Sequence, residues 1–127
     1  MTYSEILARL ETATGPDREI DARIAYAVDW TVGGVPFRKI CEEIDGEMYW
    51  CGDLPPYTAS LDAVVALIES ELPGWWWQVR SLAGGKFTAA AAESPRPERQ
   101  GKGSFGLTPP LALLTAAVRA LADKEAA

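Results

Sequence analysis

Apolar residues recur at intervals of three and four residues in four segments of the chain, which is the spacing of one face of an α-helix. The segments lie at 3–10, 20–28, 61–72 and 111–121. Each follows a residue whose side-chain oxygen can accept a hydrogen bond from the first backbone amides of a helix. These expected N-caps are Thr2, Asp17, Ser60 and Thr108. The pattern therefore predicts four helices, the first two forming a helical hairpin within 1–30.

Alternating apolar and polar residues and turn signals between these helices predict two β-hairpins. Their strands are expected at 37–44, 48–51, 75–82 and 86–93, and a short edge strand is expected from Phe105. A hairpin followed by a helix thus occurs twice within 31–122. The order predicts an α+β fold in a single domain, 1–127, whose mostly antiparallel sheet of about four to five strands is built from both hairpins. The tail at 123–127 is expected to fray.

The Asp-Gly turn of the first hairpin allows two registers. A two-residue loop pairs Ile44 with Glu47, and a three-residue loop pairs it with Met48. A shift of one residue turns every side chain of a strand to the opposite face. We expect the three-residue loop because it gathers the apolar side chains of both strands on one face. That register places Cys41 directly across from Cys51, and both are expected to be thiols because an intracellular chain is normally kept reduced.

Three consecutive tryptophans, 75–77, open the second hairpin. Successive strand side chains point to opposite faces, so Trp75 and Trp77 share one face while Trp76 and Arg80 share the other. The partner strand carries a run of alanines at 89–92. Because small side chains beside large indoles pack a core well, we expect Trp75 and Trp77 to be core residues.

The composition narrows the possible functions. Hydrophobic residues make up 48% of the chain, and 18 acidic against 12 basic residues give a net charge of −6. A negative protein is disfavoured for binding to bulk nucleic acid or to an anionic membrane. No apolar run approaches the roughly 18 residues of a membrane span, and the N-terminus lacks the basic start of a signal peptide. We therefore expect a soluble, cytoplasmic protein.

The chain contains no histidine, which excludes nucleophile systems and acid–base pairs that depend on imidazole. Two cysteines cannot form a four-thiolate zinc site, and no glycine-rich phosphate loop is present. Asp53, Asp62 and Tyr57 can be drawn as an acid–base set, but capping of a helix explains Asp62 more simply. We expect a protein that is not an enzyme and that needs no metal or other cofactor.

Three short motifs occur in a characteristic order: YTASLDA at 57–63, LPGWWW at 72–77 and TPPLALL at 108–114. Together with TGPDREID at 14–21, they resemble the phage ABA sandwich domain family. Members are small proteins of bacteriophages and prophages, largely of unknown function. The resemblance implies a layered α/β/α sandwich and a place in the cytoplasm of a host cell. It supplies no catalytic residues.

Charge is distributed unevenly along the chain. The segment 42–53 carries five acidic and no basic residues, whereas 80–102 carries five basic residues against two acidic ones. A positive region on an otherwise acidic protein attracts a small anion, while the remaining negative charge repels a long polyanion.

The first functional hypothesis is non-catalytic binding of a small anionic nucleotide, such as a cyclic nucleotide or an ADP-ribose-type signal of host immunity. Cationic side chains would hold the phosphates, and an aromatic ring would stack on the base. Sequestering such a signal would counteract host defence. The candidate ligand-binding residues are Trp76, Arg80, Arg96, Arg99, Lys102, Trp50 and Tyr57.

The second hypothesis is a protein–protein interaction module that inhibits or adapts a host or phage protein. The acidic hairpin at 42–53 would present Tyr49 and Trp50 amid five carboxylates, an arrangement typical of interface anchors. Self-association that buries exposed aromatic residues is compatible with both hypotheses, so we expect a homodimer.

Overall fold

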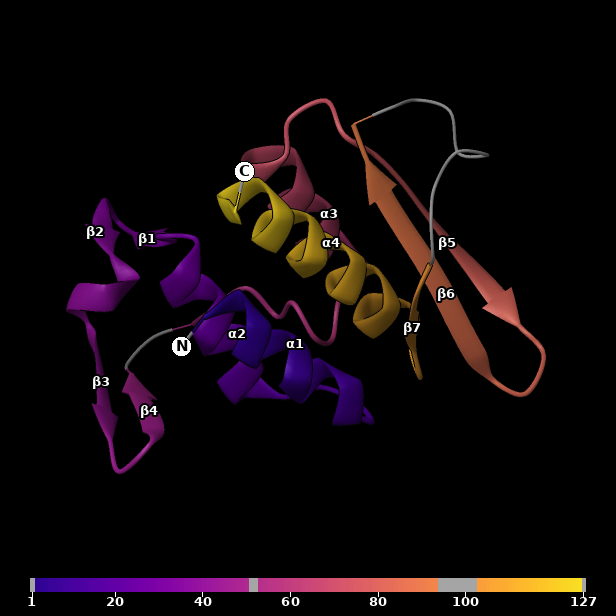
Figure 1. Ribbon diagram of the computed structural model, residues 1–127. Coiled ribbons are helices and arrows are strands. Elements are labelled where there is room, and N and C mark those ends of the chain that lie inside the picture. Colours follow the sequence, from indigo (N-terminus) through magenta and orange to yellow (C-terminus); the bar gives the residue numbers. More distant parts are fainter. Residues whose placement is uncertain (1, 51–52, 94–102, 127) are drawn as a thin grey trace.

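The computed structural model describes residues 2–50, 53–93 and 103–126. Within these ranges the protein has an α+β fold with four α-helices (Figure 1). They are α1 (Tyr3–Thr12), α2 (Arg18–Ala27), α3 (Leu61–Glu71) and α4 (Pro109–Ala126). The described strands form antiparallel sheets of two, two and three strands. The strands are β1 (Thr31–Val32) with β2 (Val35–Pro36), β3 (Cys41–Ile44) with β4 (Glu47–Trp50), and β5 (Trp76–Leu82), β6 (Lys86–Ala92) and β7 (Ser104–Gly106).

All four helices begin where the capping residues predicted. The side chains of Thr2, Asp17, Ser60 and Thr108 accept hydrogen bonds from the amides of Glu5, Ile20, Ala63 and Leu111. Pro109 occupies the first position of α4, where a missing amide costs no hydrogen bond. Helix α4 continues to Ala126, so residues 123–126, where the sequence predicts a frayed tail, are helical in the structure.

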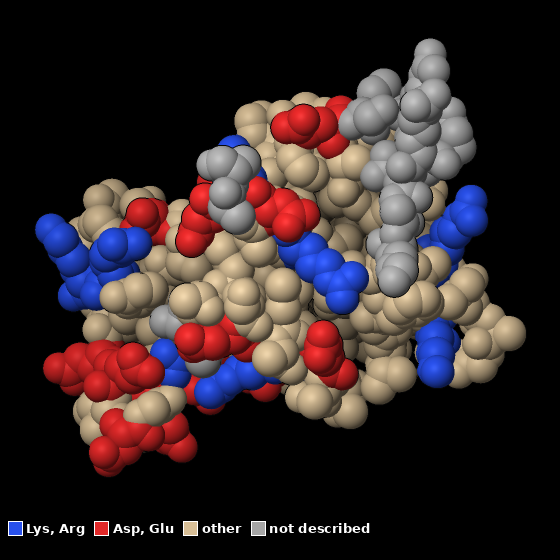
Figure 2. Space-filling model, viewed as in Figure 1, with Lys and Arg blue, Asp and Glu red and all other residues tan. Residues whose placement is uncertain are grey.

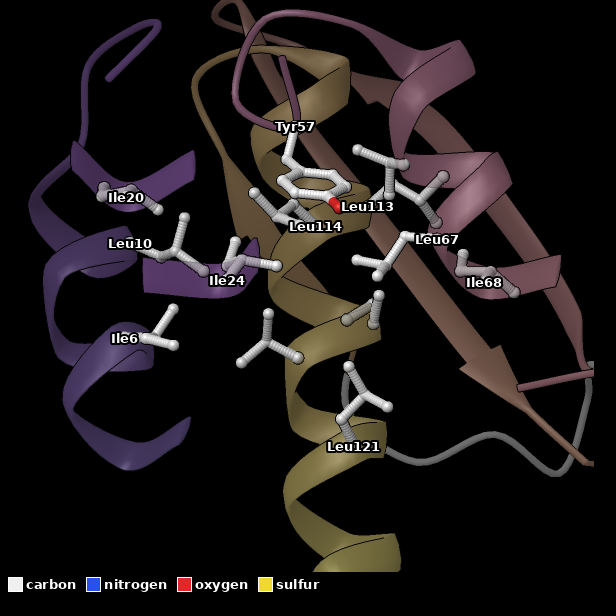
Figure 3. Close-up of a cluster of buried hydrophobic side chains, with 14 of the residues drawn as sticks. Ile6, Leu10, Ile20, Ile24, Tyr57, Leu67, Ile68, Leu113, Leu114 and Leu121 are labelled. Carbon is white, nitrogen blue, oxygen red and sulfur yellow. The ribbon is translucent and has the colours of Figure 1, made fainter. Parts of the chain in front are cut away.

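Helix α4 is the centre of the hydrophobic core (Figure 3). Every residue from 111 to 118 is buried, so this part of the helix is enclosed on all sides. It packs against α1, α3 and all three strands of the β5–β6–β7 sheet. Tyr57, from the loop before α3, completes the core and is only 3% exposed.

The two predicted hairpins do not combine into one sheet: β3–β4 and β5–β6–β7 are separate. Helix α4 covers one face of β5–β6–β7, and the described residues place no helix over the opposite face (Figure 1). A single sheet of four to five strands flanked by helices is therefore wrong. The β5–β6 register, which pairs Trp77 with Ala91 and Val79 with Ala89, puts these side chains on the face toward α4.

Trp77 is 38% exposed, which contradicts its prediction as a core residue. Its strand is one of the two edge strands of the sheet, and α4 packs more closely against β6 and β7 than against β5 (Figure 1). The indole therefore extends past the area that the helix covers. Trp75 is half-buried and packs against the core, as predicted.

The first hairpin adopts the two-residue loop, with Ile44 paired to Glu47, so the three-residue register is wrong. Asp45 and Gly46 both have positive φ angles, 53° and 82°, as the favoured type I′ hairpin turn requires. Cys41 lies opposite Trp50 and is a free thiol, while Cys51 lies outside the described residues. The predicted strand 37–44 begins only at Cys41, because 37–39 form a short 3-10 helix.

A buried arginine holds this hairpin to α2. Arg23 is only 3% exposed, and its guanidinium donates to Glu43 Oε1 at 2.9 Å, Gly46 O at 2.7 Å and Glu19 Oε1 at 3.3 Å. Removing one partner from a buried charged network leaves the others uncompensated. The hairpin is thus fixed by a polar anchor as well as by Met48, its one buried residue in the described part.

A second polar cluster connects two of the motifs found in the sequence, 14–21 and 57–63. The carboxylate of Asp21 is fully buried and accepts hydrogen bonds from Thr58 N at 2.8 Å and Thr58 Oγ1 at 2.9 Å. Arg18 Nη1 donates to the second carboxylate oxygen at 2.9 Å. Thr58 Oγ1 also accepts from Asp17 N at 2.7 Å. These contacts attach the start of α2 to the loop that positions Tyr57.

Replacing Gly106 with alanine should destabilise the fold. A Cβ atom at this position would lie 2.5 Å from Ala112 N, so β7 and the first turn of α4 would have to separate. We expect the free energy of unfolding in urea to fall by about 1–3 kcal/mol. Gly15→Ala is the control, since its added Cβ meets nothing within 4 Å. An equal effect of both substitutions would contradict the close approach.

Thr58→Val should also lower stability, because it removes a hydroxyl that contacts both Asp17 and Asp21 while keeping the shape of the side chain. Loss of a hydrogen-bond partner from a buried carboxylate should cost about 1–3 kcal/mol in urea unfolding. Thr12→Val changes an exposed threonine and should leave stability within about 0.5 kcal/mol of the parent protein. A Thr58→Val protein as stable as that control would show that the cluster contributes nothing.

Candidate functional site

The face of the β5–β6–β7 sheet that points away from α4 is the candidate site, and we call it the outer face. Its residues alternate with those that face the core. They are Trp76, Gln78, Arg80, Leu82, Lys86, Thr88, Ala90, Ala92 and Phe105. Phe105 is 64% exposed and Leu82 is 41% exposed, so the described residues leave much of this surface open to solvent.

Strand pairing sets the geometry of the outer face. Arg80 lies opposite Thr88, and Thr88 lies opposite Phe105, so these three side chains form one row across the sheet. Trp76 is four residues from Arg80, or roughly 13 Å along the strand. It lies opposite Ala92 and is half-buried. The two aromatic residues of the outer face, Trp76 and Phe105, thus lie on the two edge strands. Two alanines of β6, the strand between them, lie on the same face.

The outer face is positively charged. Arg80 and Lys86 are its ionisable residues among the described ones, and both are exposed. Acidic side chains gather instead around β3–β4, at the other end of the molecule (Figure 2). The described part of the chain thus places cations on the outer face and an acidic patch on the first hairpin, with further charges of both signs elsewhere on the surface (Figure 2).

The predicted ligand-binding residues are only partly brought together. Trp76 and Arg80 share the outer face, as the alternation of the strand predicted. Arg96, Arg99 and Lys102 lie outside the described residues.

Trp50 and Tyr57 do not belong to this surface. Trp50 is half-buried in the first hairpin, with its ring centroid 6.4 Å from that of Phe37. Tyr57 is enclosed between α3 and α4 (Figure 3), so its ring is not available for stacking on a ligand. The structure therefore does not bring these two residues together with Trp76. Both rings satisfy packing demands of the core instead.

Phe105 and Lys86 are the outer-face residues that sequence reasoning missed as site residues. The short strand from Phe105 was predicted, but its pairing with β6 was not. The segment 93–103 separates the two strands in sequence, and no local pattern determines a register across such a separation. Lys86 could have been found, because it has the same strand parity as Thr88 and the outward residues of β6.

The acidic hairpin presents one aromatic anchor rather than two. Tyr49 is 51% exposed, and its hydroxyl donates to Glu47 Oε2 at 3.0 Å. The hydrogen bond and the charge of Glu47 raise the pKa of Tyr49. Glu43 is engaged by Arg23, which lowers the pKa of that carboxyl. The hairpin is thus less negative than its sequence indicates.

The chain matches no protein-family model, no curated protein and no solved structure. The resemblance to the phage ABA sandwich domain family therefore stays a prediction. Within 2–50, 53–93 and 103–126, no helix combines the length and the apolar character that membrane crossing requires. The same residues contain no group of three or more potential metal ligands among histidine, cysteine, aspartate and glutamate.

The ion pair of Glu43 with Arg23 should make stability depend on pH. Because the pKa of Glu43 is lowered from its usual 4.5, its stabilising contribution is present above that pH and is lost as the pH falls through the lowered pKa. Glu43→Gln should therefore lower the melting temperature at pH 7, and the difference from the parent protein should shrink on acidification. Glu42→Gln, which changes the preceding residue of the same strand, is the control. A difference for Glu43→Gln that is independent of pH would contradict the ion pair.

Proposed function

We propose that this protein binds a small anionic nucleotide on the outer face of its β5–β6–β7 sheet and does not transform it chemically. The observation that supports this function is the combination of Trp76 and Phe105 with Arg80 and Lys86 on a face that no described helix covers. An aromatic ring stacks on a nucleobase whatever the base, and a guanidinium offers paired donors to a phosphate.

The arrangement of the outer face suits a small ligand rather than a polymer. Phe105 and Arg80 lie two strands apart, roughly 10 Å, so a base on one and a phosphate on the other span about one nucleotide. Beyond this face the protein is acidic, with a net charge of −6 over the chain. A long nucleic acid would be repelled by that charge, whereas a nucleotide occupies only the positive area.

Binding without turnover follows from the side chains that are available. On the described outer face, the side-chain hydroxyl belongs to Thr88 and the side-chain amide belongs to Gln78. Neither is activated by a neighbouring base, because the charged residues of this face are the cations Arg80 and Lys86. The described part of this face therefore offers recognition groups and no general acid–base pair.

The biological setting comes from the sequence resemblance alone. In a phage protein, binding of this kind would sequester a nucleotide signal of host immunity in the host cytoplasm. The phage origin and the homodimer are further predictions, and binding on the outer face requires neither of them.

A second candidate function is recognition of a basic host or phage protein by the β3–β4 hairpin. The observation in its favour is Tyr49, which is half-exposed beside the exposed carboxylates of Glu42, Asp45 and Glu47. This resembles an aromatic anchor with a polar rim. The half-burial of Trp50 makes the surface smaller than the sequence indicates.

Calorimetric titration of the full chain with cyclic dinucleotides, cyclic trinucleotides and ADP-ribose tests the proposal. At least one should bind, and Trp76→Ala should weaken its affinity roughly five- to 100-fold, as loss of one stacked base does. Arg80→Gln should weaken it about tenfold and reduce the salt dependence. The bound nucleotide should be recovered unchanged by chromatography.

The matched controls are Trp77→Ala, which removes the neighbouring indole from the opposite face, and Lys39→Gln, which removes an exposed charge away from the sheet. Both should leave the affinity within about twofold. If no nucleotide binds, or if Trp77→Ala is as damaging as Trp76→Ala, the outer face is not the site. Recovery of a cleaved nucleotide would contradict binding without turnover.

A further inference from the structure

A groove lies between the end of α2, the loop before α3 and α3 itself, away from the outer face. Its volume is about 390 Å³, within the roughly 300–1,000 Å³ of typical ligand pockets. Trp30, Tyr57 and Leu67 supply apolar and aromatic lining. Asp29 and Glu71 supply carboxylates. The described lining residues include no lysine or arginine, so the groove is both aromatic and negative.

Tyr57 is the part of this groove that packing alone does not explain. The residue is 3% exposed, yet no described residue forms a hydrogen bond with its hydroxyl, which points toward α3 beside Leu67 (Figure 3). The fully buried side-chain atoms that lack a partner do not include this oxygen, so the hydroxyl is accessible from the groove. Burial and the carboxylates of Asp21 and Glu71 raise the pKa of Tyr57 to about 12. The phenol is therefore neutral at pH 7, and its oxygen can accept a hydrogen bond.

The carboxylates remain available to a ligand. Glu71 forms no ion pair among the described residues, and the nearby Lys124 Nζ donates to its backbone carbonyl, at 3.1 Å, rather than to its carboxylate. Asp29 uses one oxygen, Oδ1, to bind Arg38 Nη2 at 2.6 Å. The lining of the groove itself is therefore negative, and the two cations at its margins, Arg38 and Lys124, balance its two carboxylates overall.

We propose that this groove binds a small organic cation, a primary ammonium group carried on an apolar body. The ammonium would donate to the Glu71 carboxylate and the Tyr57 hydroxyl, and the body would lie against Trp30 and Leu67. Ammonium ions are attracted to the faces of aromatic rings, most strongly when the site is partly desolvated. This site is separate from the nucleotide-binding face and does not depend on it.

Titration with phenethylammonium, followed by calorimetry and by amide chemical shifts of α3, tests this site. The neutral 2-phenylethanol has nearly the same shape and should bind at least about fivefold more weakly, since it lacks the charge. Glu71→Gln should lower the affinity for phenethylammonium by about fivefold and leave the affinity for 2-phenylethanol unchanged. Glu69→Gln, an exposed carboxylate on the same helix outside the groove, is the matched control and should change neither.

Tyr57→Phe removes only the hydroxyl and should also weaken the binding of phenethylammonium. If that variant fails to fold by circular dichroism, Glu71→Gln decides the question, because its side chain lies at the surface of the groove. Equal affinity for the amine and the alcohol, no binding of either, or an effect of Glu69→Gln as large as that of Glu71→Gln would overturn the proposal. Trp76→Ala should retain amine binding, which separates this test from that of the nucleotide.

Discussion

The burial of α4 is the constraint on which the rest of the structure depends. A helix that is apolar around its whole circumference must be enclosed, because any exposed side would leave leucine or valine in water. Helices α1 and α3 and the β5–β6–β7 sheet together provide that enclosure. One face of the sheet therefore packs against α4, and the other face carries Trp76, Arg80 and Phe105. Core and candidate site are two sides of the same three strands.

Local patterns predicted the helices well and the relations between distant segments poorly. Periodicity and capping residues act within a few positions, so all four helices were found with their starting points. The register of the first hairpin depended on the turn and on Arg23, which lies 20 residues from Glu43 in the sequence. Apolar patterning failed there because the hairpin has no broad buried face: Ile44 is 50% exposed. Separation of the hairpins into two sheets is likewise a tertiary property.

The candidate site shows the same division. Alternation along one strand was sufficient to place Trp76 and Arg80 together, since this relation is local. Phe105 joined them only through pairing across a long connection. Trp50 and Tyr57 were selected for their ring chemistry, and ring chemistry does not distinguish a stacking platform from a core residue. The Tyr57 ring became a core residue because Thr58 next to it is held by Asp21.

The position of α4 in the sequence has a consequence for biosynthesis. Every other described element precedes it, so a ribosome completes α1, α3 and the sheet before it makes the helix that they enclose. Until then, the apolar surfaces that later meet α4 have no native partner and are open to chaperones or to association with other chains. Slow translation of the α4 codons would prolong this interval.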